Sequence, residues 1–500
     1  MDVLIVLLAL SIAVELGLQL PGLWALRRPL AVAGMLALAA GGTLLLAWRL
    51  NVFSVLIVAL AGYRMFNMAR VVGGRMHEHY LRRATLRTSM VVIILQGVVA
   101  LAWLAWEQWH TTGHVTWTAI ASLQFVAAAV SLASVMRTTK RTSWPAAQKH
   151  YSDDELPTLT VAIPARNETD ELQSCLQSLV ASDYPKLEIL VLDDCSQTKR
   201  TPEIIRSFAH AGVRFIQGEQ PPPTWLAKNY AYDQLLRHTS GELVLFCGAD
   251  IRFERDSLRK LASLMIQRRK SMVSILPLRS PGNYGAASLI QAMRYWWELV
   301  PPRRFTNRPP VLSSCWIISR DALQKAGGFK AVARSIVPEA HFAKAAIRMR
   351  DGYSFLRAGR GNGIVSVKTL TGQRDTAVRM RYPQVHRRPE QVAIHSFLEF
   401  SFLLLPFALS LGGFFVDIGL AAQVIATLAC LLLITTHELV VLSTKVNTWW
   451  FGLIAPPFMI LADIVLLHYS MWKYEFSVVE WKGRNICIPA MHVIPHLPKI

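Results

Sequence analysis

Long apolar runs fill the first 145 residues of the chain and return after residue 393. A membrane-spanning helix needs about 20 mostly apolar residues. Arg64 and Asn67 interrupt the third run, and no basic segment precedes the first, which is not typical of a cleavable signal peptide. The pattern predicts a multi-pass membrane protein, with five helices before the central region and two or three after it, at about 3–24, 30–48, 52–68, 89–107 and 116–136, then 396–413, 419–442 and 449–471.

Positive charge alternates between the loops that join the first five predicted helices. Every second loop is rich in basic residues, which are Arg27 and Arg28, then Arg70, Arg75, Arg82, Arg83 and Arg87, then Arg137, Lys140 and Arg141. The loops between them hold almost none. Because loops rich in Lys and Arg stay in the cytoplasm, we expect the amino terminus outside the membrane and the central region in the cytoplasm.

The apolar runs after the central region leave the side of the carboxyl-terminal tail open. Three full crossings would place the tail outside, yet Trp481-Lys482-Gly483-Arg484 is typical of a cytoplasmic segment beside a membrane. Glu399 and Pro406 interrupt the run 396–413, so we expect this stretch to lie in the interface or to re-enter the membrane. The predicted parts are an amino-terminal transmembrane region, a cytoplasmic domain, a carboxyl-terminal transmembrane region and a cytoplasmic tail, at residues 1–145, 150–392, 393–475 and 476–500.

The central region changes to short apolar runs that alternate with stretches of helical spacing. Buried strands are predicted at 159–163, 188–192, 213–216 and 242–246, with helices between them at 169–181, 202–211 and 226–238. This alternation favours a doubly wound α/β sheet with parallel strands. Ligands of such sheets bind beyond the carboxyl ends of the strands. Asp193-Asp194 and Asp250 fall at such ends, so we expect the site there.

Composition narrows the choice of partners. The formal net charge is +20, and much of it lies beside apolar runs, as expected for contact with anionic membrane lipids. No recognition motif accompanies the charge, so we expect no nucleic acid partner. The six cysteines have neither metal-site spacing nor a paired pattern, which indicates free thiols in a reducing compartment.

A series of motifs in the central region resembles family 2 glycosyltransferases of the GT-A fold. These motifs are Val161-Ala-Ile-Pro-Ala-Arg-Asn-Glu168, Leu192-Asp-Asp-Cys-Ser196, Trp225-Leu-Ala-Lys-Asn-Tyr-Ala231, Gly248-Ala-Asp250 and Ser313 to Asp321 running into Gly327-Gly-Phe329. The Trp-x-x-Lys-Asn-x-x-Ala motif is similar to the subgroup that glycosylates hopanoids, carotenoids and other lipids. The resemblance implies a GT-A type doubly wound mixed sheet flanked by bundles of transmembrane helices. It also implies an inverting hexosyltransferase at the bacterial inner membrane.

The resemblance assigns donor-binding roles to residues at the strand ends. Pro164, Ala165 and Glu168 would line the pocket for the base of a nucleotide sugar, although Glu168 is also explained as a solvated turn residue. Asp194 would contact the base or ribose, and Asp193 would support its loop. Two adjacent aspartates at a buried strand end are costly without partners, which favours a functional role.

Two further positions concern the charge of the diphosphate. Lys228 offers a point charge for it, and an exposed helix cation is an equally good explanation of this residue. Asp250 matches the second position of the family's metal-binding Asp-x-Asp. Gly248 replaces the first aspartate, so a single carboxylate would hold Mg²⁺ or Mn²⁺ together with phosphate oxygens and water.

The catalytic base is ambiguous because the family's Glu-Asp pair is absent. Matching the glutamate gives Glu339, counting back from Gly352-Tyr353 gives His341, and it is also possible that neither residue is catalytic. A glutamate whose pKa is raised by burial and a histidine, whose pKa is near neutral pH, are both suited to act as the base. Arg381 and Tyr382 belong to a loose match to the Gln-x-x-Arg-Trp element that holds diphosphate and acceptor. An interfacial basic helix explains them equally well.

Three functions are compatible with these residues. The first is transfer of a sugar from a nucleotide-sugar donor to a lipid or membrane-delivered glycan acceptor. The second is a processive polysaccharide synthase, for which the predicted helices would form the export channel. The third is a catalytically degenerate scaffold protein that binds nucleotide sugars, a reading that Gly248 and Ala340 favour.

Overall fold

The computed structural model describes residues 2–18, 26–48, 50–72, 86–109, 114–145, 151–279, 286–301, 309–349, 352–359, 363–444 and 449–486. These residues form two compact units. A helical unit comprises residues 1–136, 396–439 and 449–461, and a unit built around a β-sheet comprises residues 137–395, 440–448 and 462–500. Several residues named above lie outside the described residues, namely Arg75, Arg82, Arg83 and the tail from residue 487 onward.

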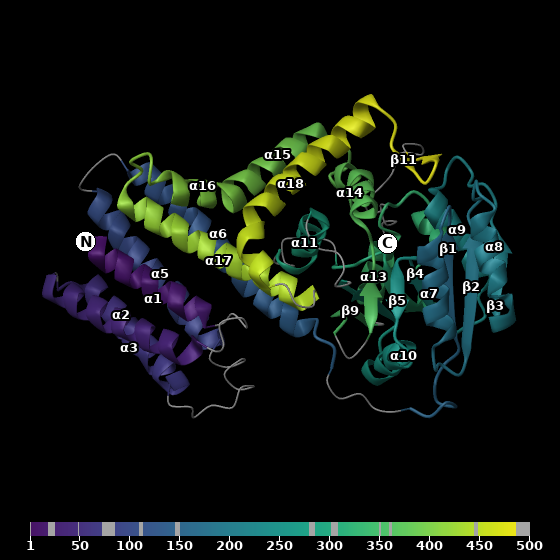
Figure 1. Ribbon diagram of the computed structural model, residues 1–500, viewed down its shortest axis with the longest axis horizontal. Helices are drawn as coiled ribbons and strands as arrows, with labels where there is room; N and C mark the ends of the chain where they lie inside the picture. The colour runs from purple at the N-terminus through teal and green to yellow at the C-terminus, as the bar shows by residue number, and fades with distance from the viewer. Residues whose placement is uncertain are drawn as a thin grey trace. The chain divides into compact units, whose positions relative to one another are not determined.

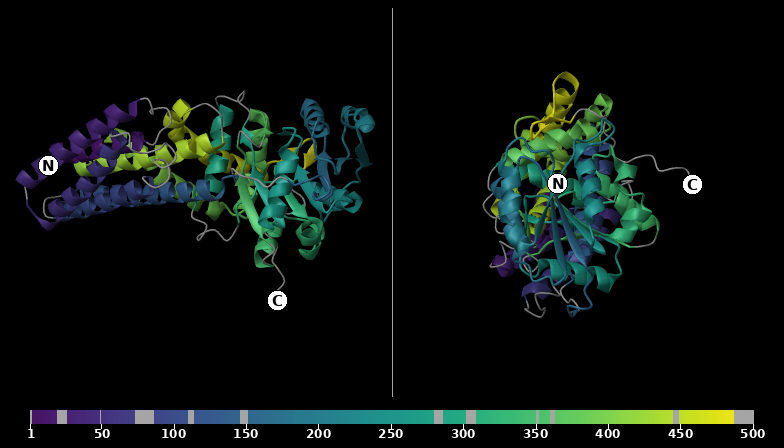
Figure 2. Two further views of the ribbon diagram at one scale, coloured as in Figure 1. Left: turned by 90° about the horizontal axis from the view of Figure 1, so that it is seen from below. Right: turned by 90° about the vertical axis from the view of Figure 1, so that its right-hand side faces the viewer.

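Apolar helices make up the helical unit (Figures 1 and 2). Helix α1 packs on α2, α2 on α3 and α3 on α5. The helices with residues in this unit are α1 (Asp2–Gly17), α2 (Arg27–Trp48), α3 (Val52–Val72), α5 (Leu86–Trp109), α6 (Val115–Arg141), α15 (Pro389–Glu399), the π-helix η5 (Phe400–Leu404), α16 (Leu405–Gly412), α17 (Leu420–Thr444) and α18 (Trp449–Phe476). Among the described helices, six are long and apolar enough to cross a membrane, at Arg27–Ala47, Val52–Val72, Val115–Arg141, Pro389–Gly412, Leu420–Thr444 and Ile454–Phe476.

A buried polar cluster explains the charge in the third apolar run. Arg64 is fully buried and donates from Nε to Glu15 at 2.6 Å and from Nη1 to Gln96 at 2.5 Å. Gln96 in turn donates to the carbonyl of Ile57 at 2.9 Å. An ionisable residue at membrane depth is tolerated when it faces other helices and is paired there. Arg64 therefore links α1, α3 and α5 without breaking the apolar surface.

The second unit contains a seven-stranded mixed sheet of order β3-β2-β1-β4-β8-β6-β9. Its neighbouring strands are parallel except that β8 is antiparallel to both β4 and β6. The α/β mixed sheet implied by the resemblance is thus confirmed. The strands are β1 (Leu159–Ala165), β2 (Leu187–Asp193), β3 (Val213–Gln217), β4 (Leu243–Cys247), β6 (Met272–Leu276), β8 (Cys315–Ser319) and β9 (Tyr353–Arg357).

Helices cover both faces of this sheet (Figure 1). Alternating side chains of the central strands pack against these helices. One face is covered by α7 (Asp170–Val180), α8 (Arg200–Ser207) and α10 (Ser257–Arg268), and the other by α9 (Ala227–His238), α12 (Arg320–Lys325) and α13 (Pro338–Arg348). The remaining elements of this unit are α11 (Ala286–Leu299), α14 (Leu370–Gln384), the 3₁₀ turns η3 (Ala209–Ala211) and η4 (Phe329–Val332), and the strands of two small sheets, β5 (Ile251–Phe253), β7 (Leu278–Arg279), β10 (Ile364–Ser366), β11 (Glu480–Trp481) and β12 (Arg484–Asn485).

An aromatic cluster fixes α9 and α13 onto the sheet. Trp316 of β8 stacks on Phe246 of β4 with ring centroids 4.4 Å apart, and on Phe342 of α13 at 5.8 Å. Tyr232 of α9 meets the ring of Phe246 edge-on at 4.9 Å. Such aromatic contacts bury large apolar areas and prefer stacked or edge-on geometry. The two helices are thereby held at fixed positions relative to the strand ends.

Candidate active site

A pocket of about 460 Å³ lies beyond the carboxyl ends of β1, β2 and β4. Helices α9, α11, α13 and α14 also contribute to its walls. Eight of the predicted site residues line it, namely Pro164, Ala165, Glu168, Asp194, Lys228, Asp250, Glu339 and Arg381. Three others lie outside the lining: Asp193, His341 and Tyr382. Residues separated by more than 200 positions in the sequence are thus brought together.

The β1 and β2 ends hold their acidic residues through backbone contacts. The Asp194 amide donates to the carbonyl of Ala165 at 2.7 Å, which joins the two strand ends. Arg166 is buried and donates to the carbonyls of Asp194 at 2.7 Å and Cys195 at 2.5 Å. Asp193 points away from the pocket, and its carboxylate accepts from the amide of Ser196 at 3.3 Å. Asp193 supports the loop, while Asp194 presents its carboxylate to the pocket.

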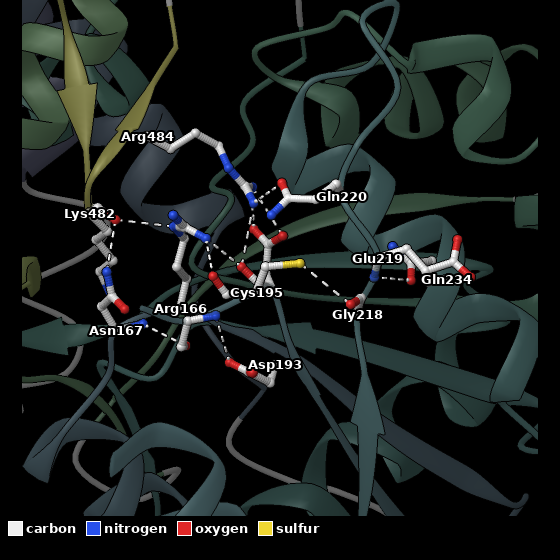
Figure 3. Close-up of polar contacts among 12 residues, drawn as sticks. Arg166, Asn167, Asp193, Cys195, Gly218, Glu219, Gln220, Gln234, Lys482 and Arg484 are labelled. Atoms are coloured by element: carbon white, nitrogen blue, oxygen red, sulfur yellow. Dashed lines mark hydrogen bonds and ion pairs between the residues drawn. The ribbon is translucent and has the colours of Figure 1, made fainter. Parts of the chain in front are cut away.

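The hairpin of β11 and β12 contributes two cations to acidic side chains of the β1 and β2 loops. Figure 3 shows Lys482 of this hairpin beside Arg166 and Asn167, and Arg484 beside Gln220. Arg484 Nη1 lies 3.0 Å and 2.8 Å from the two carboxylate oxygens of Asp194. Lys482 forms an ion pair with Glu168. The Lys482 carbonyl accepts from Arg166 at 3.1 Å and from Asn167 at 2.9 Å. The hairpin segment Trp481-Lys482-Gly483-Arg484, which the sequence associates with the membrane surface, therefore belongs to the site.

Positive φ angles make the tight turn of this hairpin. Lys482 has φ 50° and Gly483 has φ 74°. Two consecutive residues with positive φ are typical of the two-residue turn that joins antiparallel strands, and glycine adopts this conformation readily. The turn directs Lys482 and Arg484 toward Glu168 and Asp194. In the sequence, this hairpin is marked only by Lys482 and Arg484 on either side of Gly483. The local sequence does not indicate which residues they contact.

Burial and ion pairing act in opposite directions on these carboxyls. Burial raises the pKa of Glu168, and the Lys482 ammonium partly offsets that rise. Burial likewise raises the pKa of Asp194, against the guanidinium of Arg484. Desolvation disfavours a charged carboxylate, whereas a nearby cation favours it. Both acids therefore depend on the hairpin for much of their stabilisation as anions.

Asp250 is held at the next strand end by β10. Its Oδ2 accepts from the Ser366 hydroxyl at 3.0 Å, and its carbonyl accepts from the Val367 amide at 2.9 Å. A Cβ at Gly248 would lie 2.5 Å from Asp250 Oδ1, so a second side chain has no room there in this arrangement. Within the described residues, no group of three or more His, Cys, Asp or Glu is placed to hold a metal ion.

The two candidate bases occupy different environments on α13. Glu339 lies in the first turn of the helix and faces the pocket, where the helix dipole favours negative charge. His341 turns away, and its Nε2 lies 3.0 Å from the carbonyl of Ala326. Burial lowers the pKa of His341. Of the two, only Glu339 is within the pocket.

Helix α14 forms the opposite wall of the pocket, together with α11 and α18. Arg381 forms an ion pair with Asp463, which also accepts from Trp297 Nε1 at 3.1 Å. Tyr382 is fully buried against α18, where its amide donates to Ser470 at 3.1 Å. Arg379, one turn from Tyr382, lines the pocket and lies over the Trp481 ring at 4.8 Å.

Some aromatic side chains of α11 are buried, and some line the pocket. Tyr295 and Trp296 are buried, while Trp297 is half-buried and lines the pocket. Tyr295 also lines the pocket, whereas Trp296 lies outside its lining.

Comparisons with known proteins concern the same region. Residues 160–327 match the family model Glycosyl transferase family 2. The chain is 25% identical over 319 residues to the cellulose synthase 1 catalytic subunit (UDP-forming) of Komagataeibacter xylinus, covering 59% of this chain and 41% of that protein. It is 29% identical over 121 residues to a 4,4'-diaponeurosporenoate glycosyltransferase of Staphylococcus aureus (strain USA300), covering 24% and 31%. The chain thus spans less than half the length of these relatives.

Among solved structures, a mannosyltransferase from Pyrobaculum calidifontis in complex with GDP-Man and Mn²⁺ is similar with a TM-score of 0.44. It is 18% identical in sequence, and the match covers 72% of this chain and 98% of that chain.

Proposed function

We propose that the chain transfers a hexose from a nucleotide-sugar donor to a lipid or membrane-delivered glycan acceptor, with inversion at the anomeric carbon. The premise of this proposal is the match of residues 160–327 to the family model Glycosyl transferase family 2. The observation that carries the proposal is the pocket at the strand ends. It combines paired carboxylates for a nucleoside, cations for a diphosphate and one glutamate suited to general-base catalysis. These three requirements of sugar transfer meet in one pocket.

The donor end of the pocket is assigned to the loops after β1 and β2. Pro164 and Ala165 would line the base, and Asp194 and Glu168 would accept hydrogen bonds from base and ribose. Arg484 and Lys482 would close over the bound nucleoside. Lys228, in the first turn of α9, would hold the diphosphate.

The pocket offers a divalent ion one protein ligand at the position of the family's metal site. Mg²⁺ is often bound through one or two carboxylates plus substrate phosphates, and Asp250 supplies one such carboxylate. Mg²⁺ or Mn²⁺ at Asp250 would neutralise negative charge on the diphosphate leaving group. Gly248 adds no ligand, so the ion would depend on the phosphate oxygens of the donor.

Glu339 is the proposed general base. The acceptor hydroxyl oxygen attacks the anomeric carbon of the sugar while Glu339 accepts the hydroxyl proton. The bond from that carbon to the diphosphate breaks on the opposite side, and the nucleoside diphosphate leaves with the electron pair. Because Phe342 anchors α13 to Trp316, Glu339 would be held rigidly during this step.

The acceptor is proposed to enter at the wall formed by Trp297, Arg381 and Asp463. A hydrophobic acceptor would arrive through the lipid phase and a soluble donor from the cytoplasm, so a site at the membrane face serves both. The apolar helices fit a bacterial inner membrane protein whose sheet-bearing unit faces the cytoplasm. The similarity to a carotenoid glycosyltransferase supports a lipid acceptor.

A processive polysaccharide synthase is a second candidate because one relative is a cellulose synthase catalytic subunit. The two activities differ in product length. A single transfer gives one product mass per acceptor, whereas a synthase gives a ladder or a polymer. Mass spectrometry of the glycosylated product therefore separates them.

The experiment measures nucleoside diphosphate release by the purified full chain from UDP- and GDP-sugars, with Mg²⁺ or Mn²⁺ and membrane lipid extract. We expect lipid-dependent release that Glu339→Gln reduces by about a hundredfold or more, with donor binding retained. Glu203→Gln is the matched control, since Glu203 is an exposed first-turn glutamate of α8. Release that is unchanged in Glu339→Gln would remove the assigned base. Donor binding without release, abolished in Asp194→Ala, would instead support a nucleotide-sugar-binding scaffold.

A further inference from the structure

We propose that Lys228 and Lys368 together form a diphosphate-binding site that retains a nucleoside diphosphate without a divalent cation. This inference rests on the proposed function, because it assigns the diphosphate of the donor to the same pocket. Lys368 belongs to none of the motifs that the sequence indicates. Its placement comes from the small sheet.

Lys368 reaches the pocket through β10. Ser366 of this strand pairs with Ile251 of β5 in antiparallel register, and its hydroxyl donates to the Asp250 carboxylate. The Val367 amide donates to the Asp250 carbonyl at 2.9 Å. The next residue along the chain is Lys368, and its side chain lines the pocket. One side-chain and one backbone hydrogen bond to Asp250 thus hold the segment before Lys368 beside the proposed metal ligand.

Lys228 approaches the same space from the other side of the site. It lies in the first turn of α9 and lines the pocket, and its ammonium is 5.3 Å from the ring centroid of Tyr232. Tyr232 is anchored in the aromatic cluster, so the lysine stem packs against a fixed surface. Unpaired amides at the start of a helix add further attraction for an anion.

Four basic side chains line the pocket together with Asp250, namely Lys228, Lys368, Arg294 and Arg379. Glu339 is the carboxylate that acts most strongly on Lys228, ahead of Asp250. In the part of the chain that the structure describes, no carboxylate stands beside Asp250 at position 248, where a Cβ would meet the Asp250 carboxylate at 2.5 Å. A site with several carboxylates needs a metal before phosphate can approach, whereas ammonium groups attract phosphate directly.

Two of the acids at the donor end are already paired with cations. Glu168 is paired with Lys482, and Asp194 with Arg484. Their negative charge is therefore already met by cations of the hairpin. A diphosphate beside Asp250 would meet the ammonium groups of Lys228 and Lys368 first.

Burial makes the charged form of these two lysines costly until an anion binds beside them. Desolvation lowers the pKa of Lys228 and of Lys368 to about 8 in each case. A buried cation recovers stabilisation when an opposite charge binds beside it. Phosphate oxygens between the two lysines would supply that charge.

The test measures binding of UDP and of GDP to the purified full chain by calorimetry, once in EDTA and once in Mn²⁺. We expect the Kd in EDTA to stay within about threefold of the Kd in Mn²⁺. Lys368→Gln and Lys228→Gln should each weaken binding in EDTA about tenfold or more, the usual range for a hydrogen bond to a charged group. Lys368→Arg keeps the charge and should retain most of the affinity. Lys330→Gln, at an exposed lysine of η4, is the control.

Asp250→Asn separates the two ways of holding the diphosphate. Without a required metal, this change tightens binding in EDTA, because it removes negative charge beside the phosphates. Binding that appears only with Mn²⁺ and is lost in Asp250→Asn would overturn the inference and leave the proposed function standing. Failure of both nucleotides to bind under either condition would overturn the proposed function as well. Melting temperatures of all variants distinguish loss of binding from loss of fold.

Discussion

Each acidic side chain at the donor end of the pocket is paired with a cation from a distant part of the sequence. Asp194 meets Arg484, and Glu168 meets Lys482. The Asp194 and Arg484 side chains are only 6% and 14% exposed, so solvent screens their interaction little. Removal of one partner from a buried pair leaves an uncompensated charge, which costs more than the loss of an exposed pair. These two ion pairs therefore couple the fold of the hairpin to the donor loops.

A double-mutant cycle tests this coupling. We expect Arg484→Gln and Asp194→Asn to show a coupling free energy of about 1–3 kcal/mol in denaturant unfolding monitored by tryptophan fluorescence. The matched control is Arg200→Gln with Asp170→Asn, a pair whose side chains are 63% and 82% exposed. Exposed pairs contribute about 0–1 kcal/mol. Equal coupling in the two cycles would contradict a structural role of the Arg484 contact.

Donor affinity should depend on pH through Lys228. Burial is the main reason that its pKa lies at about 8, with Glu339 and Asp250 acting to raise it and Arg379 and Arg294 acting to lower it. A bound diphosphate raises this pKa, so binding favours the protonated lysine. Affinity is then fully present below pH 8 and is lost as the pH rises above it.

This dependence is measured by UDP titrations between about pH 6.5 and 9.5. A single lysine contributes at most about a tenfold fall in affinity per pH unit above its pKa in the free protein. Lys228→Gln should make the curve shallower, whereas Lys330→Gln should not. A flat curve for the unaltered chain would show that the ammonium of Lys228 does not contribute to binding.

At the scale of elements, one asparagine joins α9 to the segment before α13, in addition to the aromatic cluster that packs both helices on the sheet. The Asn229 Nδ2 donates to the carbonyls of Val332 and Ser335 at 2.8 Å each and to that of Ala333 at 3.2 Å. Asn229 is buried and follows Lys228 directly. The three carbonyls belong to the segment that leads into α13, which carries Glu339. The asparagine thus ties the proposed diphosphate ligand to the proposed base.

Asn229→Ala removes the donor for these carbonyls and should destabilise the protein by about 1–3 kcal/mol, as expected for unsatisfied buried polar groups. Donor affinity and turnover should fall together, because α9 and the segment before α13 lose their common anchor. Asn229→Asp places carboxylate oxygens against carbonyl oxygens and should be more damaging than alanine. Denaturant unfolding and nucleoside diphosphate release measure the two effects. A stable Asn229→Asp variant would refute this role.

The elements that local pattern predicts well are those with short apolar runs and polar ends. The first predicted strand, 159–163, is Leu159–Ala165 in the structure, and the second, 188–192, is Leu187–Asp193. Both strands are buried in the sheet, so their runs are continuous. The antiparallel strand β8 follows from pairing with β4 and β6 over long separations. The apolar run of a strand does not indicate whether the strand is parallel or antiparallel to its neighbours in the sheet.

The same reasoning explains which site residues were found. Asp194 and Asp250 lie a few residues after predicted strands, so the rule for strand ends locates them, and the resemblance to family 2 glycosyltransferases adds Glu168. Lys368 and Lys482 line the pocket, and Arg484 pairs with Asp194, from segments more than 100 residues downstream of Asp250. A basic residue in a polar segment fits a membrane surface, a solvated face or an anion site equally well. Only the tertiary contacts separate these alternatives.

At the scale of the whole chain, the hairpin constrains the number of membrane crossings. Lys482 and Arg484 bond to the β1 and β2 loops within one compact unit. We infer that, in a membrane, the part of the sheet-bearing unit before Pro389 and the hairpin lie on the same side, which requires an even number of crossings between them. Among the described residues, three apolar helices from Pro389 onward are long enough to cross, at Pro389–Gly412, Leu420–Thr444 and Ile454–Phe476. We infer that one of the three does not cross completely.

We infer that the incomplete crossing belongs to α18, whereas the sequence pattern favours 396–413. From residue 462 onward, α18 is part of the sheet-bearing unit, which leaves Trp449–Leu461 in the helical unit. Residues 396–439, in contrast, lie wholly in the helical unit. Helix α17 and the helix formed by α15, η5 and α16 would then supply the two crossings.

Cysteine labelling with a membrane-impermeant maleimide tests this topology in intact cells. Phe415 lies between the two proposed crossings and is 87% exposed, and Val478 precedes the hairpin and is 48% exposed. We expect Phe415→Cys to react without permeabilisation and Val478→Cys to react only after it. Reaction of both on the same side would contradict two crossings, and a tag at Ile500 reachable only from outside would contradict the cytoplasmic tail. An external Val478 would also separate the hairpin from the cytoplasmic donor loops, so the contacts of Lys482 and Arg484 could not form in the membrane-inserted protein.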